Sequence, residues 1–503
     1  MHLALAYLGR ESVPLEYLSA AAKRAGHRVS FAYDPGAFSD NDNVYHNAWL
    51  ERRFARIDLL EQKLRRDPPD AILFFVYSNT FQWGLELARR VRRDRPVPTI
   101  FAGLHATMAP AAVLREPEVD YVIVGEGEET LPELLDCLAA SQSPAEVRGI
   151  QYREDGEARA TPMRPPLDLE TLPLPDKELF ADEFNMADDY VILCGRGCPC
   201  SCTYCREGTI RRLYGKGYFR RRRIDSIIHE LETMRARHGF GRVMIDDPIL
   251  FTPKAWTLEL LDAYRSRVNL PFRCYGQVGH FDEEIGRALL DAGCYGLEFG
   301  LQTANEEIRL NILGRDDSDE QMRRALEICD RIGLRYDLDH MFGLPGETEQ
   351  DFIDAARLYA DARRLNRVKV HMLAYFPGAP IVQTAERMGV IGPEVSAAIE
   401  RGEVGDICRE PGANDEQTRR FMREWKTFYK VMPLLGRRLG RAFIDRGWHR
   451  WFGRLPFPVE ILLQLLVALR GRDQRFVVYI KYLWFRLRRH RQVRREARAM
   501  GWS

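Results

Sequence analysis

The chain has 503 residues, 45% of them hydrophobic and 29% charged, and its formal net charge is +1 at pH 7. This length and ordinary globular composition allow large buried cores and predict two or three domains. The sequence has no internal repeat and no low-complexity tract, which excludes solenoid and disordered architectures, and its balanced charge indicates no particular class of partner.

The N-terminal stretch MHLALAYLGRESVPLEYL lacks the basic start, the sustained apolar run and the small-residue cleavage site of a signal peptide. We therefore expect the protein in the cytoplasm. In that compartment clustered cysteines are usually metal or redox sites, whereas scattered cysteines are usually small buried hydrophobic residues. The scattered cysteines are Cys137, Cys274, Cys294, Cys329 and Cys408.

Residues 1 to about 137 alternate short apolar runs with amphipathic stretches. Runs such as HLALAY, AILFFVY and DYVIVGEG predict buried strands, and LEYLSAAAKRAG and FQWGLELARRVRRD predict helices. The alternation predicts a doubly wound, Rossmann-like parallel sheet, which binds ligands beyond the carboxyl ends of its strands. The alternative is that the segments at these ends are ordinary turns with helix caps. The candidate binding residues there are Ser78, Asn79, Thr80, Gly103, His105, Gly125 and Glu126.

The alternation of strands and helices stops between about 138 and 190. The proline-rich stretch MRPPLDLETLPLPDKELF is typical of an extended connector. We expect this segment to be a linker between two domains.

Residues from about 191 to 385 alternate strand and helix again. The runs YVILCGRG, RVMIDDPIL, FRCYGQVG, YGLEFGLQT, YDLDHMFGLPGE and RVKVHMLAYFPG predict six strands. With helices between them, they predict a partial (β/α)6 barrel whose chemistry lies at the carboxyl ends of the strands.

A dense cysteine cluster, CGRGCPCSCTYC at 194–205, follows the first of these strands. Cys198, Cys202 and Cys205 have the spacing C-x3-C-x2-C, which lets three thiolates of one loop converge on one metal centre. A structural zinc site usually needs a second cysteine pair, and the sequence has none. Three protein ligands leave one metal position open for a substrate or cofactor, which favours catalysis. Cys194 and Cys200 are extra cysteines, and either is an alternative fourth ligand.

The C-terminal region, about 386 to 503, is predicted to be mainly helical and is strongly basic. From residue 436 onward it holds seventeen Lys and Arg against four Asp and Glu, interleaved with aromatic residues. Its most apolar run, VEILLQLLVAL, is too short to span a bilayer. Two interpretations stay open, namely a peripheral contact with an anionic membrane face and a helical cap over the ligand site. We expect no nucleic-acid partner, because no binding motif accompanies the charge.

The stretch RGCPCSCTYC resembles the cluster motif of the radical S-adenosylmethionine (radical SAM) enzymes. The N-terminal domain resembles the cobalamin (B12)-binding domain fused to one large class of them, through GLHAT, DYVIVGEGEETLPELL and the following LPLPD. The resemblance covers roughly residues 2 to 385. It implies three cofactors: a [4Fe–4S] cluster, SAM and cobalamin.

For the cluster, the resemblance implies that Cys198, Cys202 and Cys205 ligate a [4Fe–4S] cluster whose open iron chelates the amino and carboxylate groups of SAM. It implies that Tyr204 packs near the adenine, with simple loop packing as the alternative. The turn at Gly343 in GLPGE would lie beside the adenine.

For SAM, the resemblance implies contacts from the ends of other barrel strands. Asp246 or Asp247 in MIDDP would accept hydrogen bonds from the SAM amino group, with a helix cap as the alternative. Buried acidic or amide groups seldom have a purely structural reason. The further implied contacts are Gln277, Glu298 and Gln302.

For cobalamin, one departure is informative. The string D-x-H-x-x-G, which supplies a histidine ligand to cobalt in other cobalamin domains, does not occur here. The resemblance therefore implies cobalamin without a protein histidine as its lower ligand. His105 lies near the expected cleft, and we interpret it as part of the wall rather than as a ligand.

The activity that the resemblance implies is reductive cleavage of SAM to a 5′-deoxyadenosyl radical and, most simply, methylation of an unactivated carbon of a small molecule. A lipid-like molecule is one candidate substrate. An electron donor such as flavodoxin or ferredoxin would be needed. Two alternatives stay open: oxidative cyclisation or rearrangement, as on tetrapyrroles, and a non-catalytic cobalamin or redox sensor.

Overall fold

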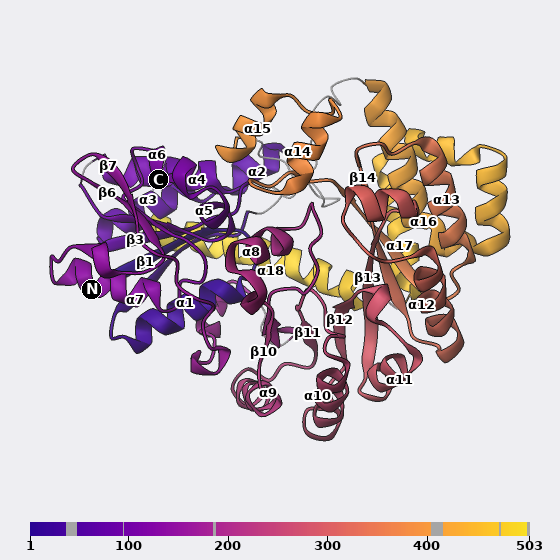
Figure 1. The fold of residues 1–503 in the computed structure, drawn as a ribbon, viewed down its shortest axis with the longest axis horizontal. Coiled ribbons are helices and arrows are strands. Elements are labelled where there is room, and N and C mark those ends of the chain that lie inside the picture. The colour runs from indigo at the N-terminus through magenta and orange to yellow at the C-terminus, as the bar shows by residue number, and fades with distance from the viewer. Residues whose placement is uncertain (37–47, 94, 185–187, 404–415, 472–473, 500–503) are drawn as a thin grey trace.

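The computed structural model describes residues 1–36, 48–93, 95–184, 188–403, 416–471 and 474–499. Figure 1 shows the N-terminal domain at one end of the molecule, the second domain in the middle and the helices α16 and α17 at the other end. Cys408 lies outside the described residues.

The N-terminal domain is a seven-stranded sheet in the order β2-β1-β3-β4-β5-β6-β7, in which the first five strands are parallel. Alternate residues of each strand enter the apolar layers on the two faces, so that Leu3 and Leu5 pack on one side and Ala4 and Ala6 on the other. The strands are β1 His2–Leu8, β2 Arg28–Asp34, β3 Ala71–Phe75, β4 Thr99–Ala102, β5 Tyr121–Ile123, β6 Ile150–Glu154 and β7 Glu157–Ala160. The helices are α1 Val13–Arg24, α2 Ala48–Phe54, α3 Ile57–Arg66, α4 Phe81–Arg92, α5 Leu104–Met108, α6 Pro110–Arg115 and α7 Thr130–Ala139.

The hairpin of β6 and β7 extends this sheet with two antiparallel strands. The sheet therefore continues to residue 160, past the predicted boundary at 137. The turn is Asp155–Gly156, with φ of 53° and 82°, and an Asp-Gly pair with left-handed backbone is a favoured two-residue hairpin turn. The extended connector follows the hairpin.

The second domain is an open, all-parallel sheet of six strands in the order β15-β14-β13-β12-β11-β8, which confirms the predicted partial barrel. The strands are β8 Tyr190–Ile192, β11 Val243–Ile245, β12 Phe272–Gly276, β13 Cys294–Gln302, β14 Tyr336–Phe342 and β15 Leu365–Met372. The helices are α8 Arg206–Tyr214, α9 Ile224–His238, α10 Lys254–Arg267, α11 Glu283–Asp291, α12 Asp319–Ile332 and α13 Glu349–Asp361. A two-stranded ribbon, β9 Gly195–Arg196 with β10 Arg220–Arg221, lies at the mouth of the sheet.

Strand periodicity separates an apolar from a polar face of this sheet. In β14, Tyr336, Leu338 and Phe342 join the core under the helices, so that Asp337 and Asp339 between them face the barrel interior. The interior is therefore lined by charged groups, and Asp337 accepts from Arg367 of β15 at 3.1 Å. This polar interior is the opposite of the packed apolar centre of a closed barrel.

The C-terminal region is helical, as predicted, and covers one edge of the sheet. Its elements are α14 Pro380–Arg387, α15 Pro393–Glu400, α16 Glu416–Asp445, η7 Trp448–Arg454, α17 Phe457–Gly471 and α18 Gln474–Ala499. In α16, Trp425 and Tyr429 are fully buried, and Tyr429 donates to the carbonyl of Phe352 at 2.8 Å. The remaining short helices are η1 Pro144–Glu146, η2 Leu169–Thr171, η3 Lys177–Phe180, η4 Gly215–Tyr218, η5 Val278–His280 and η6 Ile308–Ile312.

The last helix, α18, returns to the N-terminal domain (Figure 1). Arg489 forms an ion pair with Glu183 at 3.2 Å, and the rings of His490 and Phe54 lie 4.4 Å apart. In the described parts of the chain no single helix is long and apolar enough to cross a membrane; η7 and α17 pass that test only as a pair, bent by 119°.

Candidate functional site

A cavity of about 270 Å³ lies between the two domains. Segments that follow β1, β3, β4 and β5 form one wall, and segments that follow β8 and β11 form the other. The carboxyl ends of both parallel sheets therefore open into the same space, which is the place where such sheets bind ligands. Residues from the N-terminal side include Tyr77, Gly103, Leu104, Thr107, Gly125 and Glu126, and those from the other side include Leu193, Arg196, Arg206, Tyr214 and Asp246.

Ion pairs join the two walls at the rim of this cavity. Arg196 pairs with Glu126 at 3.4 Å and closely with Glu128, and Arg220 also pairs with Glu126. Burial alone would raise the pKa of Glu126, but Arg220 and Arg196 more than offset this and lower it. Glu126 is therefore ionised at neutral pH. Its backbone N–H donates a hydrogen bond to the phenol oxygen of Tyr214 at 2.7 Å, which is a further contact between the two walls.

Two glycines of the N-terminal wall allow close packing of their neighbours. Gly103 has a φ of +102°, and a Cβ there would lie 2.7 Å from the carbonyl oxygen of Val76. Gly125 has a φ of +88°, and a Cβ there would overlap the hydroxyl of Tyr214. Neither position accepts a side chain, so the backbone of both turns borders the cavity.

Ser78, Asn79, Thr80 and His105, the other predicted residues of this domain, do not line the cavity. His105 is fully buried, its Nδ1 lies 3.0 Å from Ser78 Oγ, and its ring lies 4.6 Å from that of Phe81. Burial lowers the pKa of His105 to about 4. Thr80 Oγ1 accepts from the backbone N–H of Tyr77 at 2.9 Å, and Asn79 is exposed. These residues shape the turn whose other side chains, such as Tyr77, face the cavity.

The cysteine loop connects the β8 end of the barrel to α8. Cys205 is the residue before α8 and has an extended backbone. Burial, together with the neighbouring Cys205 and Cys198 thiols, raises the pKa of Cys202 to about 11, although Arg315 opposes the shift. Burial also raises the pKa of Cys205, with Cys198 contributing. The thiols of Cys198, Cys202 and Cys205 are therefore near enough to influence one another's pKa.

The two extra cysteines have different surroundings. Cys194 is fully buried in the core under the helices, which is the environment of a structural thiol. The Cys200 thiol donates to Gln277 Oε1 at 2.8 Å and is also hydrogen-bonded with the Cys198 thiol, which raises the pKa of Cys198. In the described residues no three His, Cys, Asp or Glu side chains are arranged as around a metal ion. The donor set, three thiols on one short loop, fits an iron–sulfur cluster, and their assignment as ligands stays a prediction.

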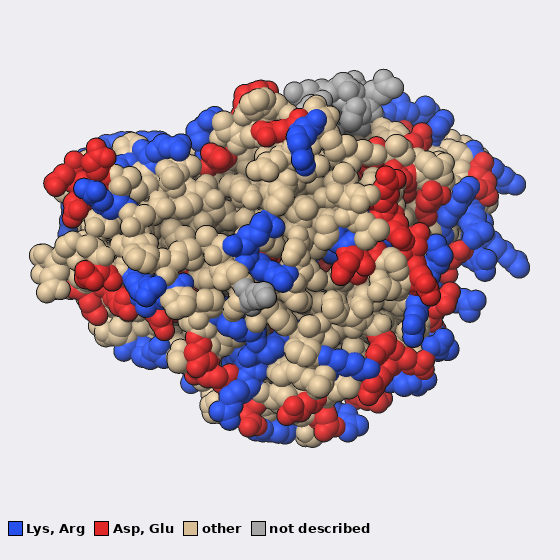
Figure 2. Space-filling view, in the orientation of Figure 1, with Lys and Arg blue, Asp and Glu red and all other residues tan. Residues whose placement is uncertain are grey.

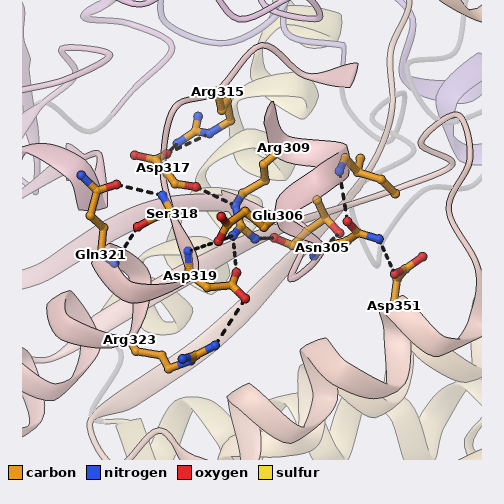
Figure 3. Close-up of polar contacts among 12 residues, drawn as sticks. Asn305, Glu306, Arg309, Arg315, Asp317, Ser318, Asp319, Gln321, Arg323 and Asp351 are labelled. Carbon is orange, nitrogen blue, oxygen red and sulfur yellow. Dashed lines mark hydrogen bonds and ion pairs between the residues drawn. The ribbon is translucent and has the colours of Figure 1, made fainter. Parts of the chain in front are cut away.

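A buried polar network lies behind this loop (Figure 3). Arg315 pairs with Asp317 at 2.6 Å and donates to the hydroxyl of Tyr204 at 3.2 Å and to the carbonyl of Gly300 at 2.8 Å. Asp317 accepts from Gln277 Nε2 at 2.9 Å. The network therefore connects the cysteine loop, through Tyr204, to the ends of β12 and β13.

Arg309 extends this network from Asp317 to Thr303 and Asp319. It is 1% exposed and donates to the carbonyls of Asp317 at 3.1 Å and Thr303 at 2.8 Å, and it pairs with Asp319. Ser318 and Gln321 form a capping box at the start of α12, which fixes the same loop. Arg309, Arg315 and Asp317 were not predicted as site residues; the sequence shows them only as charges in RLNILGRDDSDE.

The two aspartates after β11 have separate roles. Asp246 lines the cavity, and burial raises its pKa. Asp247 instead accepts from the backbone N–H of Cys194 at 2.7 Å and pairs with Arg221. Of the two predicted candidates, Asp246 is therefore the one open to a ligand, and Asp247 positions the start of the cysteine segment.

The middle parts of β13, β14 and β15 bring together further titratable groups. Glu298 pairs with Lys369, and His371 Nε2 lies 3.6 Å from Asp339 Oδ1. Burial raises the pKa of Glu298 to about 7, with Lys369 opposing and Asp339 reinforcing the shift. Gln302 has a φ of 68° at an irregularity of the ladder between β13 and β14. Gly343 donates its N–H to Glu347 at 3.0 Å in the turn after β14.

The described geometry agrees with comparisons to known proteins. Residues 192–359 match the model of the Radical SAM superfamily, and residues 10–135 match the model of the B12 binding domain. The two matched segments are the two domains that face each other across the cavity. They correspond to the two resemblances predicted from the sequence.

Individual relatives are distant. The chain is 25% identical over 306 residues to an uncharacterised methyltransferase of Pyrococcus horikoshii, covering 60% of this chain and 65% of that protein, slightly less than two thirds of its length. It is 23% identical over 429 residues to cytidylyl-2-hydroxyethylphosphonate methyltransferase of Streptomyces wedmorensis, covering 76% and 79%. The solved structure of the radical S-adenosylmethionine methyltransferase TsrM from Kitasatospora setae, with cobalamin and a [4Fe–4S] cluster bound, matches with a TM-score of 0.61 and 20% identity over 78% of this chain and 79% of that one. The structural similarity concerns the fold.

Proposed function

Because the chain belongs to the cobalamin-binding radical SAM enzymes, we propose that it is a cobalamin-dependent radical SAM methyltransferase that methylates an unactivated carbon of a small molecule. The observation that carries the proposal is the cavity between the domains. It is walled by the glycine-bearing turns of the B12-binding domain on one side and by the mouth of the barrel, next to the cysteine loop, on the other. A methyl donor and a radical generator can therefore face the same substrate. The distant relatives named as methyltransferases support the reaction type.

The residues that would hold the cofactors come from separate elements. Cys198, Cys202 and Cys205 would ligate the cluster, and the backbone at Gly103 and Gly125 would border the corrin. The barrel side chains that would meet SAM are Tyr204, Asp246, Gln277, Glu298 and Gln302. Bound together, these cofactors supply one-electron cleavage of SAM and a transferable methyl group, which side chains alone cannot provide.

The chain's own contribution is placement and protection. The ion pairs of Glu126 with Arg196 and Arg220 hold the two walls in register. The Arg315–Asp317 network fixes Tyr204 and Gln277 beside the cysteine loop. Such positioning raises the effective concentration of reacting groups, and enclosure limits access of water.

The polar barrel interior supports a substrate that carries polar or charged groups. Lys369 and His371 of β15 and Asp339 of β14 face this interior, and the His371 side chain is 39% exposed. These groups can donate to or accept from a small molecule held above the strand ends. The site therefore contains both a positively charged group, Lys369, and a negatively charged group, Asp339, that can contact a substrate.

Anaerobic incubation of the reconstituted protein with SAM, a reductant and cobalamin tests the proposal. We expect 5′-deoxyadenosine to form and cobalamin to co-purify in a near-stoichiometric amount. If the protein holds intact, reducible clusters but cleaves no SAM, the result would contradict an enzymatic function and favour the non-catalytic sensor. SAM cleavage with substrate conversion but no transferred methyl group would favour cyclisation or rearrangement.

We also propose a docking surface for a flavodoxin or ferredoxin at α8. Basic side chains gather at the centre of the face shown in Figure 2, where Figure 1 places α8, within largely uncharged surface. Arg211 of α8 donates to Ser201 Oγ at 3.0 Å and to the carbonyl of Pro199 in the cysteine loop, and Arg212 is exposed. A basic surface directly over a cluster loop suits an acidic redox partner.

Charge reversal at this surface tests the docking. Arg211→Glu/Arg212→Glu should slow SAM cleavage driven by reduced flavodoxin roughly tenfold, with a weaker effect at high salt. Cleavage driven by dithionite should be unchanged. An equal loss with both reductants would mean that the substitutions damage the loop itself rather than docking.

The proposed location is the cytoplasm, where free thiols and such electron donors occur, with a peripheral contact at the inner membrane face through the basic C-terminal region. Exposed aromatic residues in that region, Trp451 at 61% and Trp484 at 56%, support the contact.

A further inference from the structure

A small pocket of about 170 Å³ lies at the end of the barrel opposite the cofactor cavity, where β14 and β15 begin. Its wall is formed by the start of these strands, by Pro433 of α16 and by the last residues of α17. Four arginines line it: Arg335, Arg363, Arg364 and Arg470. The lining otherwise consists of Leu365, Asn366, Pro433 and Gly471, without a carboxylate.

Among the residues that the structure describes, most of the guanidinium groups of this pocket have no acidic partner; the nearby carboxylate of Asp330 accepts from the backbone N–H groups of Arg363 and Arg364, at 3.0 and 2.7 Å. In the described parts of the chain, the side chains of Arg363, Arg364 and Arg470 have no ion pair and no hydrogen bond. Arg335 donates to Asn366 Oδ1 at 3.2 Å and to the carbonyl of Gly471 at 2.7 Å, which holds its guanidinium at the wall.

Neighbouring arginines behave differently. Arg437 and Arg441 of α16 both pair with Asp361, at 3.1 and 2.6 Å. Like charges that converge on one small space repel one another, and an anion with several oxygens would relieve this repulsion. Guanidinium groups bind phosphate with matched, two-pronged geometry.

An apolar stripe leads to the same place. Val459, Leu462, Leu466 and Leu469 of α17 are 38%, 53%, 43% and 65% exposed. Their spacing of three, four and three residues puts them on one face of the helix. The opposite face, with Val467 and Ala468, is buried. Arg470 directly follows the last leucine of the stripe, so that the apolar face ends at the arginine pocket.

We propose that this surface docks the protein on an anionic phospholipid membrane, with a lipid phosphate in the arginine pocket and the leucine stripe against the acyl chains. An interfacial helix needs an apolar face of this kind together with basic groups at headgroup level. A soluble phosphate would need the pocket alone and leaves the exposed leucines unexplained. The inference makes the proposed peripheral location specific and does not depend on the proposed reaction.

Vesicle co-sedimentation of the full-length protein tests this inference. The probes are vesicles of phosphatidylcholine alone and of phosphatidylcholine with phosphatidylglycerol. We expect binding to the anionic vesicles at least about tenfold tighter than to neutral ones, with a further decrease at high salt. Arg363→Gln/Arg364→Gln should reduce anionic binding about tenfold or more. Leu462→Ser/Leu466→Ser should reduce it as well, because the stripe would no longer enter the bilayer.

A matched control removes two exposed charges elsewhere. Arg265 of α10 and Arg287 of α11 are exposed and paired with acids of their own helices, and Arg265→Gln/Arg287→Gln should bind vesicles as the wild type does. All variants should keep the wild-type melting temperature and SAM cleavage, which separates this test from that of the reaction.

Three results would overturn the inference. The first is equal binding of wild type to neutral and anionic vesicles. The second is wild-type vesicle binding by Arg363→Gln/Arg364→Gln. The third is stabilisation of the wild type, but not of this variant, by inorganic phosphate without any vesicle binding, which would make the pocket a site for a soluble anion.

Discussion

Cys202→Ala should lose essentially all SAM cleavage, by at least about a hundredfold, together with most of the bound iron, because a cluster held by three thiolates cannot keep its geometry with two. Cys202 is 6% exposed and its thiol interacts with those of Cys205 and Cys198. The measurements are iron and sulfide content, the visible absorption of the cluster and the yield of 5′-deoxyadenosine under anaerobic conditions.

Cys200→Ala is the matched control, because Cys200 belongs to the same loop and its thiol donates to Gln277. We expect this variant to keep its iron and at least a large part of its activity. The prediction is wrong if Cys200→Ala loses the cluster while Cys198→Ala or Cys205→Ala retains it, since the ligand set would then include Cys200.

Arg315→Leu should destabilise the barrel by about 3–5 kcal/mol, the usual cost of leaving one partner of a buried ion pair uncompensated. Asp317 is 2% exposed and would lose its paired guanidinium, while Tyr204 would lose the donor that orients its hydroxyl. We also expect weaker SAM binding, because Gln277 is fixed through Asp317. Urea-induced unfolding and equilibrium SAM binding measure the two effects.

Arg323→Leu provides the comparison within the same part of the molecule. Arg323, labelled in Figure 3, pairs with Asp319 at 3.3 Å, and its side chain is 63% exposed. Exposed ion pairs of this kind contribute little to the free energy of unfolding, so Arg323→Leu should change that free energy by less than about 1 kcal/mol. Similar effects of the two substitutions would contradict a special role for the buried pair.

Much of the fold follows from local sequence pattern. The strands of both parallel sheets are nearly continuous apolar runs, and those of the barrel also alternate, so that YDLDHMF predicts a strand with one charged face. The spacing of the cysteines predicts one shared centre because all three lie on one loop. The β6–β7 hairpin was missed although its Asp-Gly turn is a known signal, because prolines dominate the segment that follows it.

The details of the site depend on geometry that the sequence does not contain. Ser78 and Asn79 follow β3 and His105 follows β4, and both segments border the cavity. The direction of each side chain decides that Tyr77 and Leu104 line the cavity instead. Arg315 lies 111 residues from Tyr204 along the chain. Only the three-dimensional path of the loop between β13 and α12 brings them together.

The return of α18 to the first domain has a mechanical consequence. β1 at the start of the chain and the far end of α18 lie at the same end of the molecule (Figure 1). The barrel is thus tethered to that domain twice, by the connector before β8 and by the contacts of Arg489 and His490. Two domains joined by a single linker can rotate relative to each other over a wide range, whereas a second connection restricts most of this rotation. Exchange of a bulky cofactor would then proceed by rearrangement of the turns at the rim, while the domains stay together.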